Sequence, residues 1–145
     1  MTTRELEKNI FFALRKTGTY LCFEVAMPGT FGGSRERVDL LTYDTSGKWR
    51  FYELKVSKSD FHSKSAKTFL GHYNYYVMPL ELYEQVKTEI PDEIGCYVAD
   101  KYGFTRCAKK AKRQKLRVEE TALKFSFMQA LSRQFDKVMC NGKKK

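Results

Sequence analysis

The sequence predicts a single domain of the mixed α/β class. Helical and strand patterns follow one another along the 145 residues in the order helix, three strands, helix, strand, with further elements after them. A chain of this length can bury one sizeable core but not two. Hydrophobic residues make up 42% of the chain, and prolines and glycines are few, so the composition is globular rather than disordered or fibrous.

The first third of the chain predicts a helix and then a strand. We expect the helix over residues 2–16, because Thr2 and Glu5 form a capping-box pattern ahead of apolar residues at helical spacing. Residues 20–27 are rich in strand-forming side chains. The proline and glycines of residues 28–34 then predict a loop.

The stretch RVDLLTYDTSGKWRFYELK predicts a hairpin, with strands at about 36–43 and 49–56. Ser57 or Ser59 can cap a helix that follows at about 59–71. The later elements are a strand at 74–79, a helix at 79–90, a strand at 95–100, a possible hairpin partner for it at 104–108 and a long amphipathic helix at 118–139.

The predicted domain therefore has a core at 3–100, a basic segment at 101–117, the long C-terminal helix and a disordered lysine tail at 140–145. The amphipathic face of the C-terminal helix has to pack on the domain or on a second copy. A homodimer through this helix is therefore considered.

Positive charge is concentrated near the C-terminus. The formal net charge is +10, and residues 101–117 hold eight Lys or Arg and no acid, while the rest of the chain before the lysine tail is nearly balanced. Such a patch is expected of a protein that neutralises phosphates. A solvated linker and tail would have the same composition, whereas anionic lipid fits less well because large apolar residues are few. The residues expected to contact nucleic acid are Lys109, Lys110, Lys112, Arg113, Lys115 and Arg117.

Several protein classes are not favoured by the sequence. No apolar run approaches the ~20 residues of a membrane span, and MTTRELEKN lacks the apolar core of a signal peptide, so we expect a cytoplasmic or nucleoid-associated protein. The four cysteines form no CxxC pair and the two histidines lack a ligand-like spacing. Free thiols are expected rather than disulfides or a zinc site.

Two acidic residues lie inside the hairpin strands, where apolar residues are usual. In a hairpin symmetric about Ser46, Asp39 lies opposite Glu53. Like charges on such a cross-strand pair destabilise a sheet, and a cation would remove the repulsion. Hard oxygen ligands with room for water and a phosphate favour Mg²⁺, for which Mn²⁺ can substitute. A bulge near the turn would change this register.

Lys55 follows Glu53 on the same strand face, because side chains alternate along a strand. Two acids and a lysine are typical of phosphoryl chemistry, with a metal ion that polarises the phosphate and an ammonium that orients water or offsets developing charge. The alternative is an exposed edge strand in which Asp39 pairs with Arg37 or Arg50 on the surface.

Asp39, followed one hairpin later by Glu53-Leu54-Lys55, resembles the signature of the PD-(D/E)XK nuclease superfamily, with Val38 in place of the proline. The wider phrase FEVAMP…RERVDLL…YELKVSKSDF…AKTF…NYYVMP is similar to the MmcB-like group of DNA-repair nucleases and related phage proteins. This resemblance implies a restriction-endonuclease-like core over residues 3–78. It fades beyond residue 79.

The resemblance also implies site residues. Glu24 becomes a third acidic residue of the site, the backbone carbonyl of Leu54 becomes a metal ligand, and Asp60, Phe61 and Lys67 mark the following helix. Glu5 is a weaker candidate for the acidic site. Lys58, Lys64 and Lys67 either form a solvated face or contact a DNA backbone, and Tyr73, Tyr75 and Tyr76 either stack on unpaired bases or belong to the core.

The function expected from these residues is a magnesium-dependent DNA endonuclease of repair, recombination or phage DNA processing, which would act in the host cytoplasm if a phage encodes it. Asp39 and Glu53 hold the metal, Glu24 assists, and Lys55 is the general base or electrostatic stabiliser. The alternatives are a non-catalytic nucleic-acid-binding or regulatory protein on a nuclease fold, and a restriction-type enzyme with a defined recognition sequence.

Overall fold

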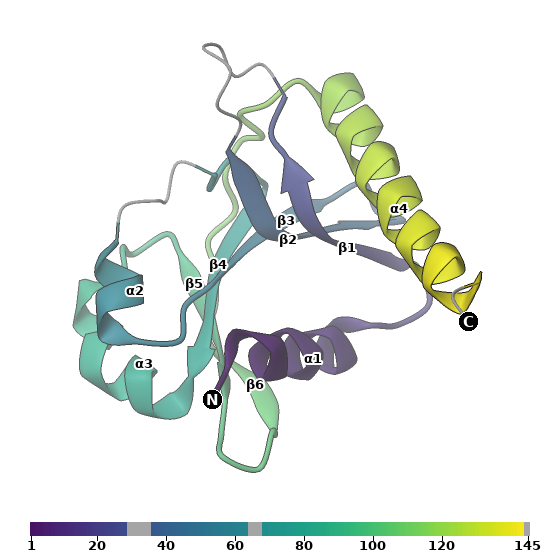
Figure 1. The fold of residues 1–145 in the computed structure, drawn as a ribbon. Coiled ribbons are helices and arrows are strands. Elements are labelled where there is room, and N and C mark those ends of the chain that lie inside the picture. Colours follow the sequence, from purple (N-terminus) through teal and green to yellow (C-terminus); the bar gives the residue numbers. More distant parts are fainter. Residues whose placement is uncertain (29–35, 64–67, 144–145) are drawn as a thin grey trace.

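A computed structural model describes residues 1–28, 36–63 and 68–143, and it has three layers, with a mixed six-stranded sheet between helices (Figure 1). The elements are α1 (Thr3–Leu14), β1 (Thr19–Ala26), β2 (Arg37–Asp44), β3 (Trp49–Leu54), α2 (Lys58–His62), β4 (Tyr73–Pro79), α3 (Leu80–Val86), the 3₁₀ turn η1 (Lys87–Glu89), β5 (Gly95–Ala99), β6 (Thr105–Lys109) and α4 (Glu120–Lys143).

The strands lie in chain order, β1-β2-β3-β4-β5-β6. The first three form an antiparallel meander, β3, β4 and β5 run parallel, and β6 returns antiparallel to β5. Parallel neighbours need a crossover, which the segments containing α2 and α3 supply. The predicted mixed α/β class, its element order and the 104–108 hairpin partner are therefore confirmed.

Each face of the sheet has its own core. On one face, Leu6 and Ile10 of α1 pack against a cluster that includes Leu40 and Tyr52. On the other face, α2, α3 and α4 pack over a cluster that includes Trp49. Because apolar side chains cover both faces, the central strands are apolar on both sides, as in other covered parallel sheets.

The tyrosines of β4 belong to these cores. Tyr75 and Tyr76 are buried, and Tyr75 stacks on Tyr52 with ring centroids 5.2 Å apart. Tyr73 is half-buried beneath the guanidinium of Arg50. Of the two interpretations of these tyrosines, the core role is the one that the structure supports.

The C-terminal helix α4 is docked along β1 and β3. Leu123, Phe127 and Ala130 are buried against the sheet, and the indole N–H of Trp49 donates to Glu120 over 2.9 Å. The helix was expected to give way to a disordered tail at residue 140. In the structure α4 continues through residues 140–143.

The predicted helix over 59–71 is shorter in the structure. Ser57 caps α2 by accepting from the N–H of Asp60, as expected, but the helix ends at His62. Ser63 adopts an extended conformation, and its hydroxyl donates to the Asp60 carbonyl, which ends the helical hydrogen-bonding pattern. The chain at 68–70 is not helical, and Lys64 and Lys67 lie outside the described residues.

Within the described parts of the chain, no helix is long and apolar enough to span a membrane. All four cysteines are free thiols in the structure.

Docking of α4 can be tested by a cavity in its buried face. Leu123→Ala should lower the free energy of unfolding by about 2–5 kcal/mol, because Leu123 has no exposed surface and its removal leaves a void. Phe135→Ala on the exposed face of the same helix is the control and should change stability by less than about 0.5 kcal/mol. Equal losses in urea unfolding would contradict the docking.

Candidate active site

Three acidic residues are level with one another on neighbouring strands. In the β1–β2 ladder Phe23 pairs with Leu40 and Val25 with Val38, so Glu24 lies level with Asp39. The β2–β3 ladder pairs Leu40 with Tyr52 and continues through Tyr43 and Trp49, which is the register predicted for a hairpin symmetric about Ser46. Asp39 is therefore level with Glu53, as the sequence indicated.

The side-chain alternation of β1 and β2 breaks at this row. Phe23 packs in the α1-side cluster but Val25 in the α4-side cluster, although residues two apart on a regular strand share a face. Val38 and Leu40 show the same change of face across Asp39. The backbone of both strands thus turns at the acidic row. The β1–β2 ladder resumes beyond it at Val25 and Val38, whereas the β2–β3 ladder ends at Leu40 and Tyr52.

Glu24 marks the break in β1. Among the described residues it is the non-glycine residue with a positive φ, 53°, which costs free energy at a side chain of this kind and needs support from neighbours. That support comes from α4, whose Gln134 side chain donates to the carbonyl of Phe23 and whose Arg133 guanidinium lies 3.4 Å from the carbonyl of Glu24. The Glu24 carboxylate itself turns outward and lies 3.6 Å from Arg37.

Asp39 and Glu53 come together at the break between β2 and β3. The Asp39 carboxylate accepts the backbone N–H of Leu54 over 2.8 Å, in place of a ladder hydrogen bond. The Glu53 side chain is buried, with 5% of the residue exposed, and is hydrogen-bonded to both Asp39 and the hydroxyl of Thr68. Burial, followed by the charge of Asp39, raises the pKa of Glu53 to about 8. Near neutral pH Glu53 therefore keeps its proton.

Lys55 lies beside this pair, as the alternation along β3 predicted. Its side chain is only 6% exposed, and its ammonium lies 4.0 Å from Asp60 and favours the ionised form of Glu53. Asp60 is held in turn, because its other carboxylate oxygen accepts the N–H of Val56 over 3.0 Å. The start of α2 and the end of β3 thus hold a cation next to two carboxyl groups.

A pocket of about 380 Å³ opens onto these groups. Glu7 of α1 faces it, whereas the candidate Glu5 closes the capping box by accepting the N–H of Thr2 over 2.7 Å. The sequence analysis missed Glu7 and Thr68. Glu7 could have been found from its position one residue after the buried Leu6, but nothing local singled out Thr68. The lining residues are Thr3, Glu7, Glu24, Arg37, Asp39, Glu53, Leu54, Lys55 and Asp60.

Some of the oxygen ligands that line the pocket suit a hard divalent cation. Among the residues that the structure describes, no three Asp, Glu, His or Cys side chains lie close enough to hold a metal by themselves. Mg²⁺, however, is commonly bound by one or two carboxylates, with water and substrate phosphate completing its shell. Asp39, Glu53 and the nearby carbonyl of Leu54 match that requirement, whereas Glu24 is turned toward Arg37 and solvent.

Residues 112–117 of the basic segment lie toward the end of the sheet away from the pocket, whereas Lys101 lies beside α1. The backbone of the segment bonds to residues that precede β4 and β5, with Gln114 donating to the His72 carbonyl and Lys112 to the Glu93 carbonyl. Glu53 pairs with Tyr76 of β4, and His72 lies four residues before Tyr76. His72 is therefore about 13 Å along the strand direction from Glu53.

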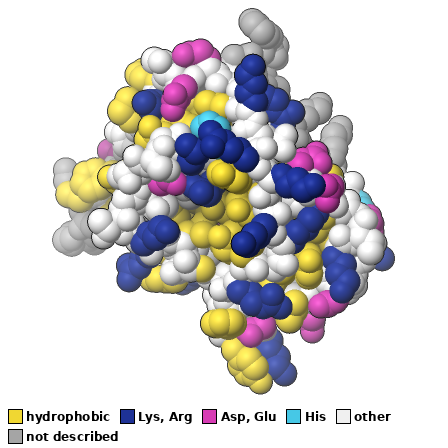
Figure 2. Space-filling model, turned by 180° about the vertical axis from the view of Figure 1, so that it is seen from behind, with side chains coloured by type: hydrophobic (Ala, Val, Ile, Leu, Met, Phe, Trp, Pro, Cys, Tyr) yellow, Lys and Arg dark blue, Asp and Glu magenta, His cyan; other side chains and the backbone are white. Residues whose placement is uncertain are grey.

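Part of the basic segment is occupied by contacts within the domain. The ammonium of Lys109 donates to the carbonyl of Pro91, Lys112 pairs with Asp92, and Arg117 donates to the carbonyl of Phe69. Lys110, Arg113 and Lys115 are exposed, as is Lys58 at the start of α2. Figure 2 shows Lys and Arg side chains spread over the rear face, with hydrophobic side chains between them. The segment therefore has a structural role as well as a positive charge.

Other basic side chains lie nearer the acidic groups. A second pocket of about 260 Å³ shares Glu7, Glu24 and Arg37 with the first one. Four cations from three separate elements line it: Arg4, Arg37, Arg133 and Lys137. This group was missed in the sequence, because its members are far apart along the chain and form no charge run.

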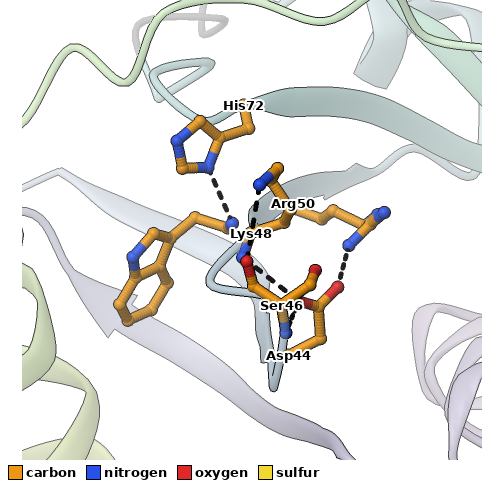
Figure 3. Close-up of polar contacts among 6 residues, drawn as sticks. Asp44, Ser46, Lys48, Arg50 and His72 are labelled. Carbon is orange, nitrogen blue, oxygen red and sulfur yellow. Dashed lines mark hydrogen bonds and ion pairs between the residues drawn. The ribbon is translucent and has the colours of Figure 1, made fainter.

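A polar network at the β2–β3 turn holds the other end of the hairpin (Figure 3). Asp44 accepts from Ser46, from the N–H of Lys48 and from Arg50, and these bonds outweigh the effect of burial and lower the pKa of Asp44 to about 2. His72 accepts the N–H of Trp49 through Nδ1 over 2.9 Å. Burial and the charge of Lys48 lower the pKa of His72, which favours this acceptor form. The network stabilises the fold and lies away from the acidic pocket.

Comparison with known proteins adds the fold alone. No family model matches the chain, and no curated protein matches it. A solved protein of unknown function from Silicibacter pomeroyi is similar in structure, with a TM-score of 0.75 over 100% of this chain and 96% of that chain, at 18% sequence identity. The mixed α/β architecture with its long C-terminal helix thus occurs in a solved protein.

The raised pKa of Glu53 predicts how the free energy of unfolding varies with pH. The native state keeps the proton of Glu53 up to about pH 8, whereas an unfolded glutamate loses it near 4.5, so unfolding free energy should fall as pH rises between these values. In EDTA the slope should approach, at most, about 1.4 kcal/mol per pH unit, the limit for one proton. Glu53→Gln should flatten it.

The matched control for this titration is Glu24→Gln, which removes an exposed carboxylate from the same row and should keep the wild-type slope. A slope that persists in Glu53→Gln, measured by urea unfolding across the pH range, would show that the proton belongs to another group.

Proposed function

We propose that this protein is a magnesium-dependent nuclease that hydrolyses phosphodiester bonds of DNA on a restriction-endonuclease-like core. The observation that supports this proposal most is the pair of carboxyl groups formed by the half-buried Asp39 and the buried Glu53 beside the ammonium of Lys55, in a pocket open to solvent. Two like charges in a buried site raise the free energy of the ion-free state. A divalent cation and a phosphate together would balance that site.

Each residue has a distinct part in the proposed reaction. Asp39, Glu53 and the carbonyl of Leu54 would bind Mg²⁺, which when bound polarises the scissile phosphate and makes a water ligand more acidic. Lys55, held by Asp60, stabilises negative charge on the phosphate or accepts the proton of the attacking water. Thr68 fixes the orientation of the Glu53 carboxyl group.

The proposed DNA contact combines cations from several elements. Arg4, Arg37 and Lys137 lie at the pocket that adjoins the acidic one, and Lys58 begins the helix that carries Asp60. Contacts of this kind bind the phosphate backbone and carry little sequence information. Glu24, paired with Arg37, is better placed to hold that arginine than to bind the metal.

A non-catalytic nucleic-acid-binding or regulatory role is the second candidate. The exposure of Glu24 supports it, because the side chain of this third acidic residue is 61% exposed and pairs with Arg37, although it lines the same pocket as the carboxyl pair. The retained Asp39, Glu53 and Lys55 support turnover instead. A cleavage assay separates the two functions.

Asp39→Asn and Glu53→Ala should each lower Mg²⁺-dependent cleavage by at least about a hundredfold, since each removes a ligand whose charge stabilises the transition state. Linear, nicked, branched and single-stranded DNA are incubated with Mg²⁺, Mn²⁺ or EDTA and analysed on denaturing gels. Mg²⁺ should also raise the melting temperature of the wild type but not of Asp39→Asn.

The control for the carboxylate variants is Asp136→Asn, which changes an exposed acid of α4 outside the pocket and should cleave like the wild type. Cleavage that survives in Glu53→Ala, or a wild type that binds DNA without cleaving any substrate, would favour the non-catalytic role.

Salt dependence identifies which cations meet the phosphates. Arg37→Ala with Lys137→Ala should reduce the slope of log affinity against log salt by about 0.9 for each lost phosphate contact. Lys110→Ala with Lys115→Ala, on the basic segment at the far end of the sheet, is the comparison and should change the slope less. A larger change of slope in the Lys110/Lys115 variant than in the Arg37/Lys137 variant would instead place the bound DNA on the basic segment.

A further inference from the structure

The hairpin between β5 and β6 carries two aromatic side chains in solvent. Tyr102 is 82% exposed and Phe104 is 68% exposed, although burial of side chains this large normally contributes strongly to stability. Figure 1 shows this hairpin below α1, and Figure 2 shows hydrophobic side chains beside Lys, Arg and acidic ones at the same lower end of the molecule. Adjacent exposed aromatics indicate a surface that binds something.

The hairpin tip is held rigid by its own hydrogen bonds. The Asp100 carboxylate accepts the N–H groups of Tyr102 and Phe104 over 2.9 and 3.0 Å, and the Asp100 N–H donates to the carbonyl of Phe104. Gly103 takes a positive φ of 86° between them, a conformation that glycine adopts without strain. The two rings are therefore presented by an ordered turn, so little conformational entropy is lost when a ligand binds them.

The tip and the acidic pocket lie on two sides of the same helix. Thr3 and Glu7 of α1 line the acidic pocket, whereas Lys8 and Asn9 line a pocket together with Tyr102. A Cβ built on Gly103 would lie 3.1 Å from the Asn9 side chain, which shows how closely the tip packs on α1. One helix diameter, about 10–12 Å, therefore separates the two features.

Basic side chains lie between them, together with acidic ones. Arg4 and Lys8, one turn apart on α1, are both exposed, and the ammonium of Lys101 lies 5.3 Å from the centre of the Tyr102 ring. Glu5 and Asp100 are hydrogen-bonded to backbone N–H groups, and Glu7 pairs with Arg4 over 3.4 Å. A polyanion that leaves the acidic pocket across α1 would meet cations first and aromatic rings next.

We propose that Tyr102 and Phe104 form a stacking platform for unpaired bases, so that the substrate is a DNA with a single-stranded segment next to the bond in the acidic pocket. This inference rests on the proposed function for the identity of the polyanion. Stacking of bases on aromatic rings needs bases that are not already stacked in a duplex, and cations beside the rings bind the strand's phosphates. A platform of this kind tolerates any base, because each base has a face that can stack.

The test measures binding apart from cleavage. The full-length protein in EDTA is titrated into fluorescein-labelled oligothymidylate and into a blunt duplex of the same length, with anisotropy as the readout. Tyr102→Ala with Phe104→Ala should weaken binding to the single strand by at least about tenfold and binding to the duplex by less than about threefold. Tyr102→Trp with Phe104→Tyr, which keeps two stacking faces, should bind like the wild type.

The control is Phe135→Ala, an aromatic of α4 with nearly the same exposure as Phe104, which should not alter either affinity. Unchanged single-strand binding in the double alanine variant overturns the inference, as does a wild type that prefers the duplex. If phosphatidylserine vesicles, and not the oligonucleotide, depend on the two rings, the tip is a membrane contact and the inference is likewise overturned. If the inference fails but the protein cleaves duplex DNA with Mg²⁺, the proposed nuclease function still holds. If single-strand binding depends on the two rings but no DNA is cleaved, the proposed nuclease function is contradicted and the stacking platform is not.

Discussion

The hydrogen-bonded contact between the carboxyl groups of Asp39 and Glu53 is the constraint around which the rest of the site is arranged. Both groups sit where two strands stop pairing regularly, and Asp39 replaces a ladder bond by accepting the N–H of Leu54. A buried pair of this kind is unfavourable unless it shares a proton or meets a cation. The fold keeps it in place, with Thr68 and Lys55 beside Glu53.

The helices around the sheet make this arrangement possible. At the left-handed turn of Glu24, side chains of α4 donate to the carbonyls of Phe23 and Glu24. The first helix closes the other side of the pocket with Glu7. The long C-terminal helix thus supports the strand that borders the site. Residues with no part in the proposed chemistry determine where the acids lie.

The sequence predicted features that depend on neighbours close in the chain or on strand periodicity. The Thr2–Glu5 capping box, the hairpin register about Ser46 and the position of Lys55 beside Glu53 all follow from local rules. Thr68 and the cations around Arg37 could not be found in this way, because tertiary packing brings them together. The turn at Glu24 was also hidden, since a glutamate inside a strand pattern gives no signal for a positive φ. The Ser63 hydroxyl donates to the Asp60 carbonyl where α2 ends, and the spacing of apolar residues gives no signal for such a bond.

The central claim is that the Asp39–Glu53 pair is a divalent cation site. The most direct measurement is a crystal structure of the protein grown with Mn²⁺, with anomalous difference density calculated at the manganese absorption edge. The account predicts a peak between the two carboxylates and the Leu54 carbonyl, with the carboxyl–carboxyl hydrogen bond lost. Density that shows the two carboxyl groups still bonded to each other, with manganese bound at some other place on the protein, would contradict it.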